Sequence, residues 1–176
     1  MPSVLENFHA NPFWKAFYSN PELYSFETEI TFLLQHYHVI KESPPRHQMV
    51  VCDFSFVLDS AYAALNLGDP QLRAFESVYR HVVRELRRPR LLIHLRCDPG
   101  TELERIRKRN RSEELSLRID YVAGLNDAVK RRVARAARQT KVLSIDSAAR
   151  DFAHREPVRK EITAEVLAAL DSLKSN

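Results

Sequence analysis

A run of basic residues is the densest group of chemically capable side chains in this sequence. On a helix, Arg105 and Arg109 lie four residues apart and share one face, whereas Leu103 and Ile106 point toward the core. Guanidinium groups held near one another bind phosphate through charge-assisted hydrogen bonds. The stretch therefore indicates a site for a small polyphosphate. The run is ERIRKRNRSEE, residues 104–114, with Arg105, Arg107, Lys108, Arg109 and Arg111.

The same run fits two other interpretations. A solvated helix end accounts for it equally well, because Lys and Arg near a helix C-terminus interact favourably with the helix dipole. A nucleic-acid surface fits poorly, because no aromatic residues interleave with the cations and acidic residues surround them. We therefore expect no nucleic-acid partner. The surrounding acids are Glu102, Glu104, Glu113 and Glu114.

Composition limits the class of protein. The 176 residues, 44% of them hydrophobic, fit a single globular domain spanning residues 1–176. The net charge of +4 favours anionic ligands without naming one. Cys52 and Cys97 lie in apolar runs and are too few for a disulfide framework, so we expect reduced core residues in a cytoplasmic protein. We expect no protein-borne metal, no export signal and no membrane span.

The hydropathy pattern predicts an α/β domain. Three short apolar runs without alternation predict parallel strands at 49–56, 91–97 and 141–146. Segments of helical period precede, separate and follow them, and residues 41–48, KESPPRHQ, predict a surface loop. Ligands collect at the carboxyl ends of such strands, where Glu6, Asp53, Asp59 and the arginines fall. The predicted helices cover 21–42, 70–86, a segment starting at 99, 120–138 and 157–173.

Four segments of the sequence carry a resemblance to a known family. They are ENFHANPFWKAFYSNPELYSFETEITFLLQHY, VVCDFSFVLDSAYAALNL, RPRLLIHLRCDPGTELERIRKRNRSEELSLRIDYVAGLN, and KVLSIDS with VRKEITAEVLAAL. Together they cover nearly the whole chain and resemble the deoxynucleoside kinases, especially the bacterial deoxyguanosine and deoxyadenosine kinases. The resemblance implies a P-loop kinase-like, three-layer domain with a mostly parallel sheet. It also implies transfer of the γ-phosphoryl group of ATP, with Mg²⁺, to the 5′-hydroxyl of a deoxynucleoside, by a homodimer.

The resemblance assigns roles at the reacting end of the substrate. It implies that Glu6 accepts the proton of the 5′-hydroxyl and that Arg105, Arg109 and Arg111 belong to a lid that closes over the phosphates of ATP. Glu6, Arg105 and Arg109 are therefore the expected catalytic residues. Such arginines stabilise the charge on the transferring group. Without the resemblance, Glu6 is an ordinary acidic residue near a helix start.

The resemblance also assigns residues to the sugar and the base. It implies that Tyr18 bonds the 3′-hydroxyl, that Glu114 acts at the same end of the sugar, and that Tyr24 lies near the base. Glu29 matches a base-reading position, where a carboxylate would accept hydrogen bonds from a guanine edge and favour purines. Core filling explains the two tyrosines equally well, and Glu29 would otherwise be a solvated residue on a helix.

Two further positions lie near the base in the family, and one of them departs from the family pattern. His36 stands where the family often has an arginine that contacts the base, and Asp59 matches the aspartate that reads the base or orients that arginine. Solvent exposure on the helix surface is an equal alternative for His36. The triplet Asp53, Phe54 and Ser55 replaces an acid-Arg-Ser triplet, so Phe54 cannot supply the phosphate contact of that arginine.

The phosphate-binding loop of the family is not found in these residues. The glycines are Gly68, Gly100 and Gly124, and none precedes a lysine, so residues 1–176 contain no GxxxxGK motif. The resemblance places the strand before that loop between the strands that hold Asp53 and His94. We expect either that residues 1–176 omit part of a natural enzyme, which leaves a gap there, or that these two strands pair directly. We expect doubtful turnover by residues 1–176. The alternative is a non-catalytic nucleoside-binding or dimerising relative.

Overall fold

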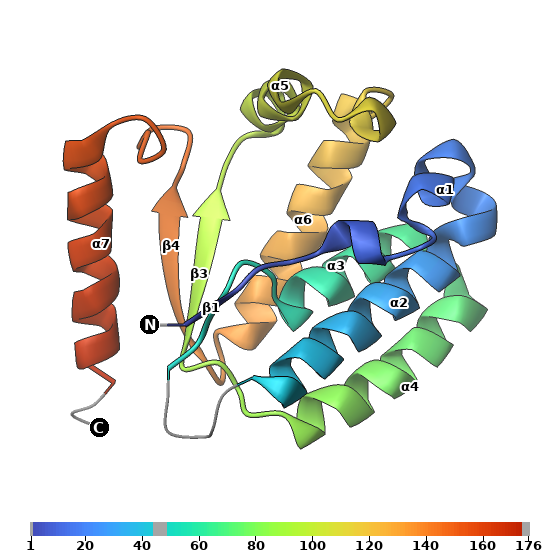
Figure 1. The fold of residues 1–176 in the computed structure, drawn as a ribbon, viewed down its shortest axis with the longest axis horizontal. Helices are drawn as coiled ribbons and strands as arrows, with labels where there is room; N and C mark the ends of the chain where they lie inside the picture. Colours follow the sequence, from blue (N-terminus) through green and yellow to red (C-terminus); the bar gives the residue numbers. More distant parts are fainter. Residues whose placement is uncertain (1, 44–48, 174–176) are drawn as a thin grey trace.

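The computed structural model describes residues 2–43 and 49–173. Helices dominate it, and the strands are short (Figure 1). The strands are β1 (Ser3–Val4), β2 (Val51–Cys52), β3 (Leu91–Arg96) and β4 (Lys141–Asp146). The α-helices are α1 (Trp14–Ser19), α2 (Pro21–Glu42), α3 (Phe56–Asn66), α4 (Asp69–Glu85), α5 (Pro99–Arg109), α6 (Ile119–Ala136) and α7 (Glu156–Asp171). Two short 3-10 helices are η1 (Phe8–Ala10) and η2 (Ser112–Glu114).

The strands form two separate parallel pairs. β1 pairs with β2 through Ser3↔Val51 and Val4↔Cys52, and β3 pairs with β4 over six residues, from Leu91↔Lys141 to Arg96↔Asp146. Among the described residues no strand pairing joins β2 to β3. The predicted α/β class with parallel strands is confirmed. Of the two expectations for the middle of the sheet, the structure shows the gap and not the direct pairing.

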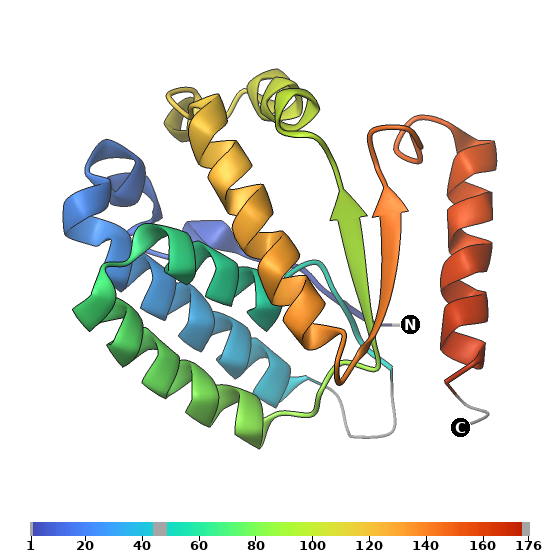
Figure 2. The same cartoon turned by 180° about the vertical axis from the view of Figure 1, so that it is seen from behind.

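Helices lie on both sides of the β3–β4 pair. α7 runs along β4 on one side, and α6 and the remaining long helices lie on the other, as both views show (Figures 1 and 2). The best-buried cluster lies among the helices and not on the sheet: Leu33 of α2, Ala63 of α3, Phe75 and Val82 of α4, and Leu67 between α3 and α4. The helical stripe of α2 predicted from sequence therefore packs against α3 and α4.

Helix α3 was not predicted as a helix, because the apolar run 49–56 resembles a strand. Only Val51–Cys52 of this run is paired as a strand, since its partner β1 has two residues and gives the run nothing further to pair with. Ser55 then caps α3, its Oγ accepting from the backbone N–H of Leu58 at 3.1 Å. The prediction of core cysteines is wrong: Cys52 and Cys97 are partly exposed, because Cys52 ends the two-residue strand β2 and Cys97 directly follows β3, and no strand pairing joins β2 to β3 among the described residues. Most of the predicted loop 41–48 lies outside the described residues.

Helix α5 begins and ends at residues suited to its termini. Asp98 Oδ1 accepts from the backbone N–H of Thr101 at 2.9 Å, and Pro99 occupies the first turn. Asn110 follows with φ of 58°, in the left-handed region that asparagine tolerates better than most residues. This turn separates Arg109, at the end of α5, from Arg111 before η2. We call residues 105–114 the lid.

Candidate functional site

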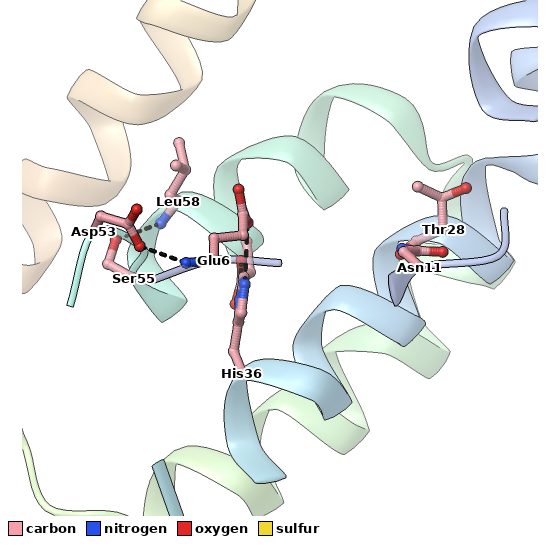
Figure 3. Close-up of polar contacts among 8 residues, drawn as sticks. Glu6, Asn11, Thr28, His36, Asp53, Ser55 and Leu58 are labelled. Atoms are coloured by element: carbon pink, nitrogen blue, oxygen red, sulfur yellow. Dashed lines mark hydrogen bonds and ion pairs between the residues drawn. The ribbon is translucent and has the colours of Figure 1, made fainter. Parts of the chain in front are cut away.

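The segment between β1 and α1 is held in place by two side chains, one aspartate and one asparagine. Asp53 Oδ1 accepts from the backbone N–H of Glu6 at 2.7 Å. Asn11 is buried, donates to the carbonyl oxygen of Thr28 on α2 at 3.0 Å, and accepts from the N–H of Phe13 at 3.0 Å. Figure 3 shows both anchors. They fix the backbone that carries Glu6 against the end of β2 and against α2.

Glu6 meets His36 and Asp59, which come from different helices. The Nε2 atom of His36 lies 3.1 Å from Glu6 Oε1, and its Nδ1 atom lies 3.0 Å from both carboxylate oxygens of Asp59. His36 and Asp59 are 5% and 6% exposed, whereas the Glu6 side chain is 37% exposed. The sequence assigned His36 and Asp59 to the base and Glu6 to the 5′-hydroxyl, but the structure brings all three together.

The environment of His36 favours its charged form. Burial lowers the pKa of His36, but the hydrogen bonds that His36 donates to Asp59 and Glu6 outweigh burial and raise the pKa to about 9. Burial also raises the pKa of Asp59, and the contact with His36 opposes that rise. The alternative of a solvated, helix-surface histidine is therefore wrong, because the ring is enclosed between two helices.

The lid closes on itself and on the N-terminal segment. Glu114 is 5% exposed and accepts from Arg109 Nη2 at 2.6 Å and from Arg111 Nη1 at 3.2 Å. The guanidinium of Arg111 lies 4.0 Å above the ring of Phe8, two residues after Glu6. The structure thus brings Arg109, Arg111 and Glu114 to the same end of the molecule as Glu6.

Arg105 is held apart from the other lid arginines. It donates from Nη2 to the carbonyl oxygen of Ser147 at 2.7 Å and from Nη1 to Ser147 Oγ at 3.2 Å. Ser147 follows β4, and its own Oγ donates to the carbonyl oxygen of Arg96 at 2.9 Å. Arg105 therefore ties α5 to the carboxyl ends of β3 and β4, and its catalytic role stays a prediction.

The residues expected at the sugar and the base lie along the inner face of α1, α2 and α6. Burial raises the pKa of Tyr18, with the charge of Glu114 as the next cause, so this tyrosine lies near the lid. Tyr24 packs with Phe13, ring centroids 6.5 Å apart. Burial likewise raises the pKa of Tyr121 to about 12, and the Tyr121 hydroxyl is shielded and makes no hydrogen bond of good geometry.

Glu29 is buried and not solvated. Burial raises its pKa to about 8, although a hydrogen bond donated by Asn66 Nδ2 at 2.8 Å opposes that rise. The structure thus places Glu29 inside, between α2 and the end of α3. Asn66 was missed in the sequence, as were Asn11 and Ser147. No spacing pattern marks these three residues, except that Asn11 precedes Pro12 in a turn-forming pair.

Among the described residues, no group of three or more His, Cys, Asp or Glu side chains has an arrangement that could hold a metal ion. Within the same residues, every helix is too short or too polar to cross a bilayer.

Solved structures with the same fold are deoxyadenosine kinases. The structure of the enzyme from M. mycoides with dCMP and a flexible dCDP has a TM-score of 0.80 at 21% identity and covers 98% of this chain and 86% of its own. The dCTP-bound structure of that enzyme has a TM-score of 0.76 at 20% identity and covers 92% and 85%. The fold is therefore the P-loop kinase fold of this class of phosphotransferase.

The sequence carries the assignment from fold to family. The model of the deoxynucleoside kinase family matches residues 2–171. Deoxyguanosine kinase of Bacillus subtilis (strain 168) is 25% identical over 172 residues, covering 94% of this chain and 83% of the relative. Deoxyadenosine kinase of Dictyostelium discoideum is 27% identical over 170 residues, covering 94% and 69%. The chain belongs to the deoxynucleoside kinase family.

Proposed function

We propose that this chain binds a deoxynucleoside with its 5′-hydroxyl against Glu6, as the acceptor for the γ-phosphoryl group of ATP. The observation that carries the proposal is the Glu6 carboxylate itself. It is partly exposed, its backbone is fixed by Asp53, and the arginine lid docks two residues away on Phe8. A carboxylate placed beside a hydroxyl and a cluster of guanidinium groups is suited to proton removal during phosphoryl transfer.

Each residue has a defined task in this proposal. Glu6 accepts the proton of the 5′-hydroxyl, and Tyr18 and Glu114 bind the 3′-hydroxyl end of the sugar. Arg109 and Arg111 face the phosphates, because their side chains remain 48% and 33% exposed while paired with Glu114. Arg105 acts with them only if it leaves Ser147. Tyr24 and Glu29 lie toward the base, and Asp59 contacts His36 beside Glu6.

The described residues fit the phosphates of ATP in part and Mg²⁺ not at all. The lid arginines supply accessible cations, but residues 1–176 contain no glycine loop with its lysine and magnesium-binding hydroxyl. No carboxylate cluster substitutes for that hydroxyl within the described residues. Residues 1–176 alone are therefore expected to bind the deoxynucleoside and to show negligible turnover with ATP and Mg²⁺.

A purine is the proposed base. One relative that matches nearly the whole chain is named deoxyguanosine kinase, and another is named deoxyadenosine kinase. Both names refer to purine deoxynucleosides. A homodimer, a cytoplasmic location and the use of ATP with Mg²⁺ also remain proposals from the family resemblance.

A second candidate function is nucleoside binding without catalysis. Residues 1–176 contain no GxxxxGK motif, and no strand pairing joins β2 to β3 among the described residues; both observations are compatible with this function. A non-catalytic relative would keep the contacts to the sugar and would need no general base at position 6.

Calorimetric titration with 2′-deoxyguanosine, 2′-deoxyadenosine and their 3′-deoxy analogues tests the proposal. We expect weak binding of the 2′-deoxynucleosides. That affinity should fall when the 3′-hydroxyl is absent, and it should also fall in Tyr18→Phe. The matched control is Tyr24→Phe, which should keep the 3′-hydroxyl dependence. Absence of deoxynucleoside binding would refute the proposed function. Phosphorylation that survives Glu6→Gln would refute the assignment of Glu6 as the general base.

A further inference from the structure

The contact between His36 and Glu6 is built from three separate parts of the chain. His36 projects from the middle of α2, Asp59 from the first turn of α3, and Glu6 from the segment after β1 (Figure 3). The imidazole ring also lies flat on Phe54, with ring centroids 4.0 Å apart and an interplanar angle of 9°. Phe54 is 7% exposed. The ring is therefore fixed in both position and orientation before any ligand arrives.

The charged side chains that pair with His36 among the described residues are both acidic. Asp59 faces it from α3 and Glu6 from the N-terminal segment. Asp53, after β2, holds the backbone of Glu6, and Glu29 lies on α2 near enough for the charge of Asp59 to act on its pKa. Among the described residues, the ion pairs of Glu6 and of Asp59 are both made with His36. One imidazole thus serves two carboxylates.

The hydrogen-bond inventory of imidazole decides its state here. A neutral ring has one N–H and can donate to one carboxylate only, whereas the imidazolium donates from both nitrogens. Both nitrogens of His36 lie within 3.1 Å of carboxylate oxygens, so the protonated ring satisfies both partners. Hydrogen bonds between charged partners are about twice as strong as neutral ones. Glu6 Oε1 is the atom engaged, which leaves Oε2 to a hydroxyl of the substrate.

We propose that His36 is a positioning residue, which in its imidazolium form holds the Glu6 carboxylate in place and aimed at the 5′-hydroxyl while Asp59 and Phe54 hold the ring. The aiming of Glu6 at the 5′-hydroxyl rests on the proposed function. The pairing of His36 with Glu6 does not depend on that function. His36 and Asp59 then act through Glu6 and not by reading the base. Phe54, which cannot replace an arginine at the phosphate, supports the ring instead.

Nuclear magnetic resonance of ¹⁵N-histidine-labelled full chain tests the pair without substrate. We expect both ring nitrogens of His36 to carry protons at pH 7, and Glu6→Gln to lower the pKa of His36 by about one unit, the usual effect of removing a neighbouring charge. His36→Gln assigns the signal. The matched control is Glu42→Gln, since Glu42 pairs with exposed His38 on the same helix at 3.2 Å and should leave His36 unchanged. An unchanged His36 pKa in Glu6→Gln would overturn the proposal.

Ligand binding tests the positioning role. The ratio of affinities for a 2′-deoxynucleoside and its 2′,5′-dideoxy analogue isolates the 5′-hydroxyl contact. We expect His36→Gln to bring that ratio at least threefold closer to one, and to leave the affinity for the dideoxy analogue nearly unchanged. A purely structural role would weaken both ligands equally and would overturn the proposal. If His36→Gln does not fold, because it leaves Asp59 buried without a cation, His36→Gln/Asp59→Asn replaces it.

The two arms separate the hypotheses. Loss of the predicted coupling between Glu6 and His36 overturns this inference alone. Absence of binding by either nucleoside to the wild-type chain overturns the proposed function, and the positioning of a 5′-hydroxyl with it.

Discussion

Glu29 shows how burial changes the chemistry that a residue type suggests. In the sequence it is a carboxylate, which only accepts hydrogen bonds and suits a guanine edge. In the structure burial raises the pKa of Glu29 to about 8, against the hydrogen bond from Asn66, so the group is mainly a neutral acid at neutral pH. A neutral carboxyl both donates and accepts, as an amide does. The hydrogen bonds that Glu29 can offer to a base therefore depend on pH and not on residue type alone.

Replacement of Glu29 by glutamine is expected to flatten the pH dependence of stability. Because the folded pKa of Glu29 lies above its unfolded value of 4.5, its contribution is fully present below about pH 4.5 and is lost as the pH rises through about 8. Urea unfolding should show that Glu29→Gln gains stability relative to wild type between pH 6 and 9, on the order of 3 kcal/mol.

His36 gives the control for that experiment. Its pKa of about 9 also lies above its unfolded value, so the stability that it adds disappears in the same direction at higher pH. The Glu29→Gln variant should therefore still lose some folding stability near pH 9, because His36 loses its proton there. An unaltered pH profile would mean that Glu29 is ionised in the folded chain.

Arg109 is expected to matter more for nucleotide binding than for folding. It is 48% exposed, and Glu114 keeps Arg111 as a partner when Arg109 is removed. Arg109→Ala should weaken binding of a deoxynucleoside triphosphate about tenfold, while the unfolding free energy falls by no more than about 1 kcal/mol. Arg107→Ala, exposed on the same helix, is the control. A large fall in melting temperature in Arg109→Ala would indicate a structural role for the arginine.

At the scale of elements, local chemistry was predictable and partner geometry was not. The Asp98-Pro99 start of α5 and the bounds of β4 follow from capping chemistry and from an apolar run with polar limits. Helix α3 did not follow, because whether residues 49–56 are extended depends on the two-residue strand β1. The contacts of His36 with Glu6 and Asp59 were equally hidden, since they join residues 30 and 23 positions apart that only tertiary packing brings together.

The turn at Asn110 is expected to set the position of the lid arginines. Its φ of 58° is unfavourable for residues other than glycine and asparagine. Asn110→Ala should cost about 1 kcal/mol in denaturant unfolding, whereas Asn110→Gly should cost little or nothing. Equal losses in both variants would show that the asparagine side chain, and not the backbone angle, stabilises the turn.

At the scale of the whole molecule, the chain exposes more surface than its mass predicts. A folded monomer of 20.4 kDa has about 8,800 Å² of accessible surface by the usual scaling, and this chain has 11559 Å². Strands that should be covered on both faces account for part of the difference: Val51, Ile93 and Leu95 are 43%, 40% and 51% exposed. The unpaired edges of β2 and β3 and this apolar surface belong to the same region of the fold, where the family resemblance places a further strand.

Leu95 and Ile145 provide a matched test of that exposure. They are direct partners across β3 and β4, yet Leu95 is 51% exposed and Ile145 is 2% exposed. In residues 1–176 alone, Leu95→Thr should change the unfolding free energy by less than about 0.5 kcal/mol, whereas Ile145→Thr should cost about 2 to 3 kcal/mol. If a further polypeptide strand covers β3 in solution, Leu95→Thr would instead cost about as much as Ile145→Thr. Comparable losses in both variants would therefore show that β3 is not bare, because only a covered leucine loses packing when it becomes threonine.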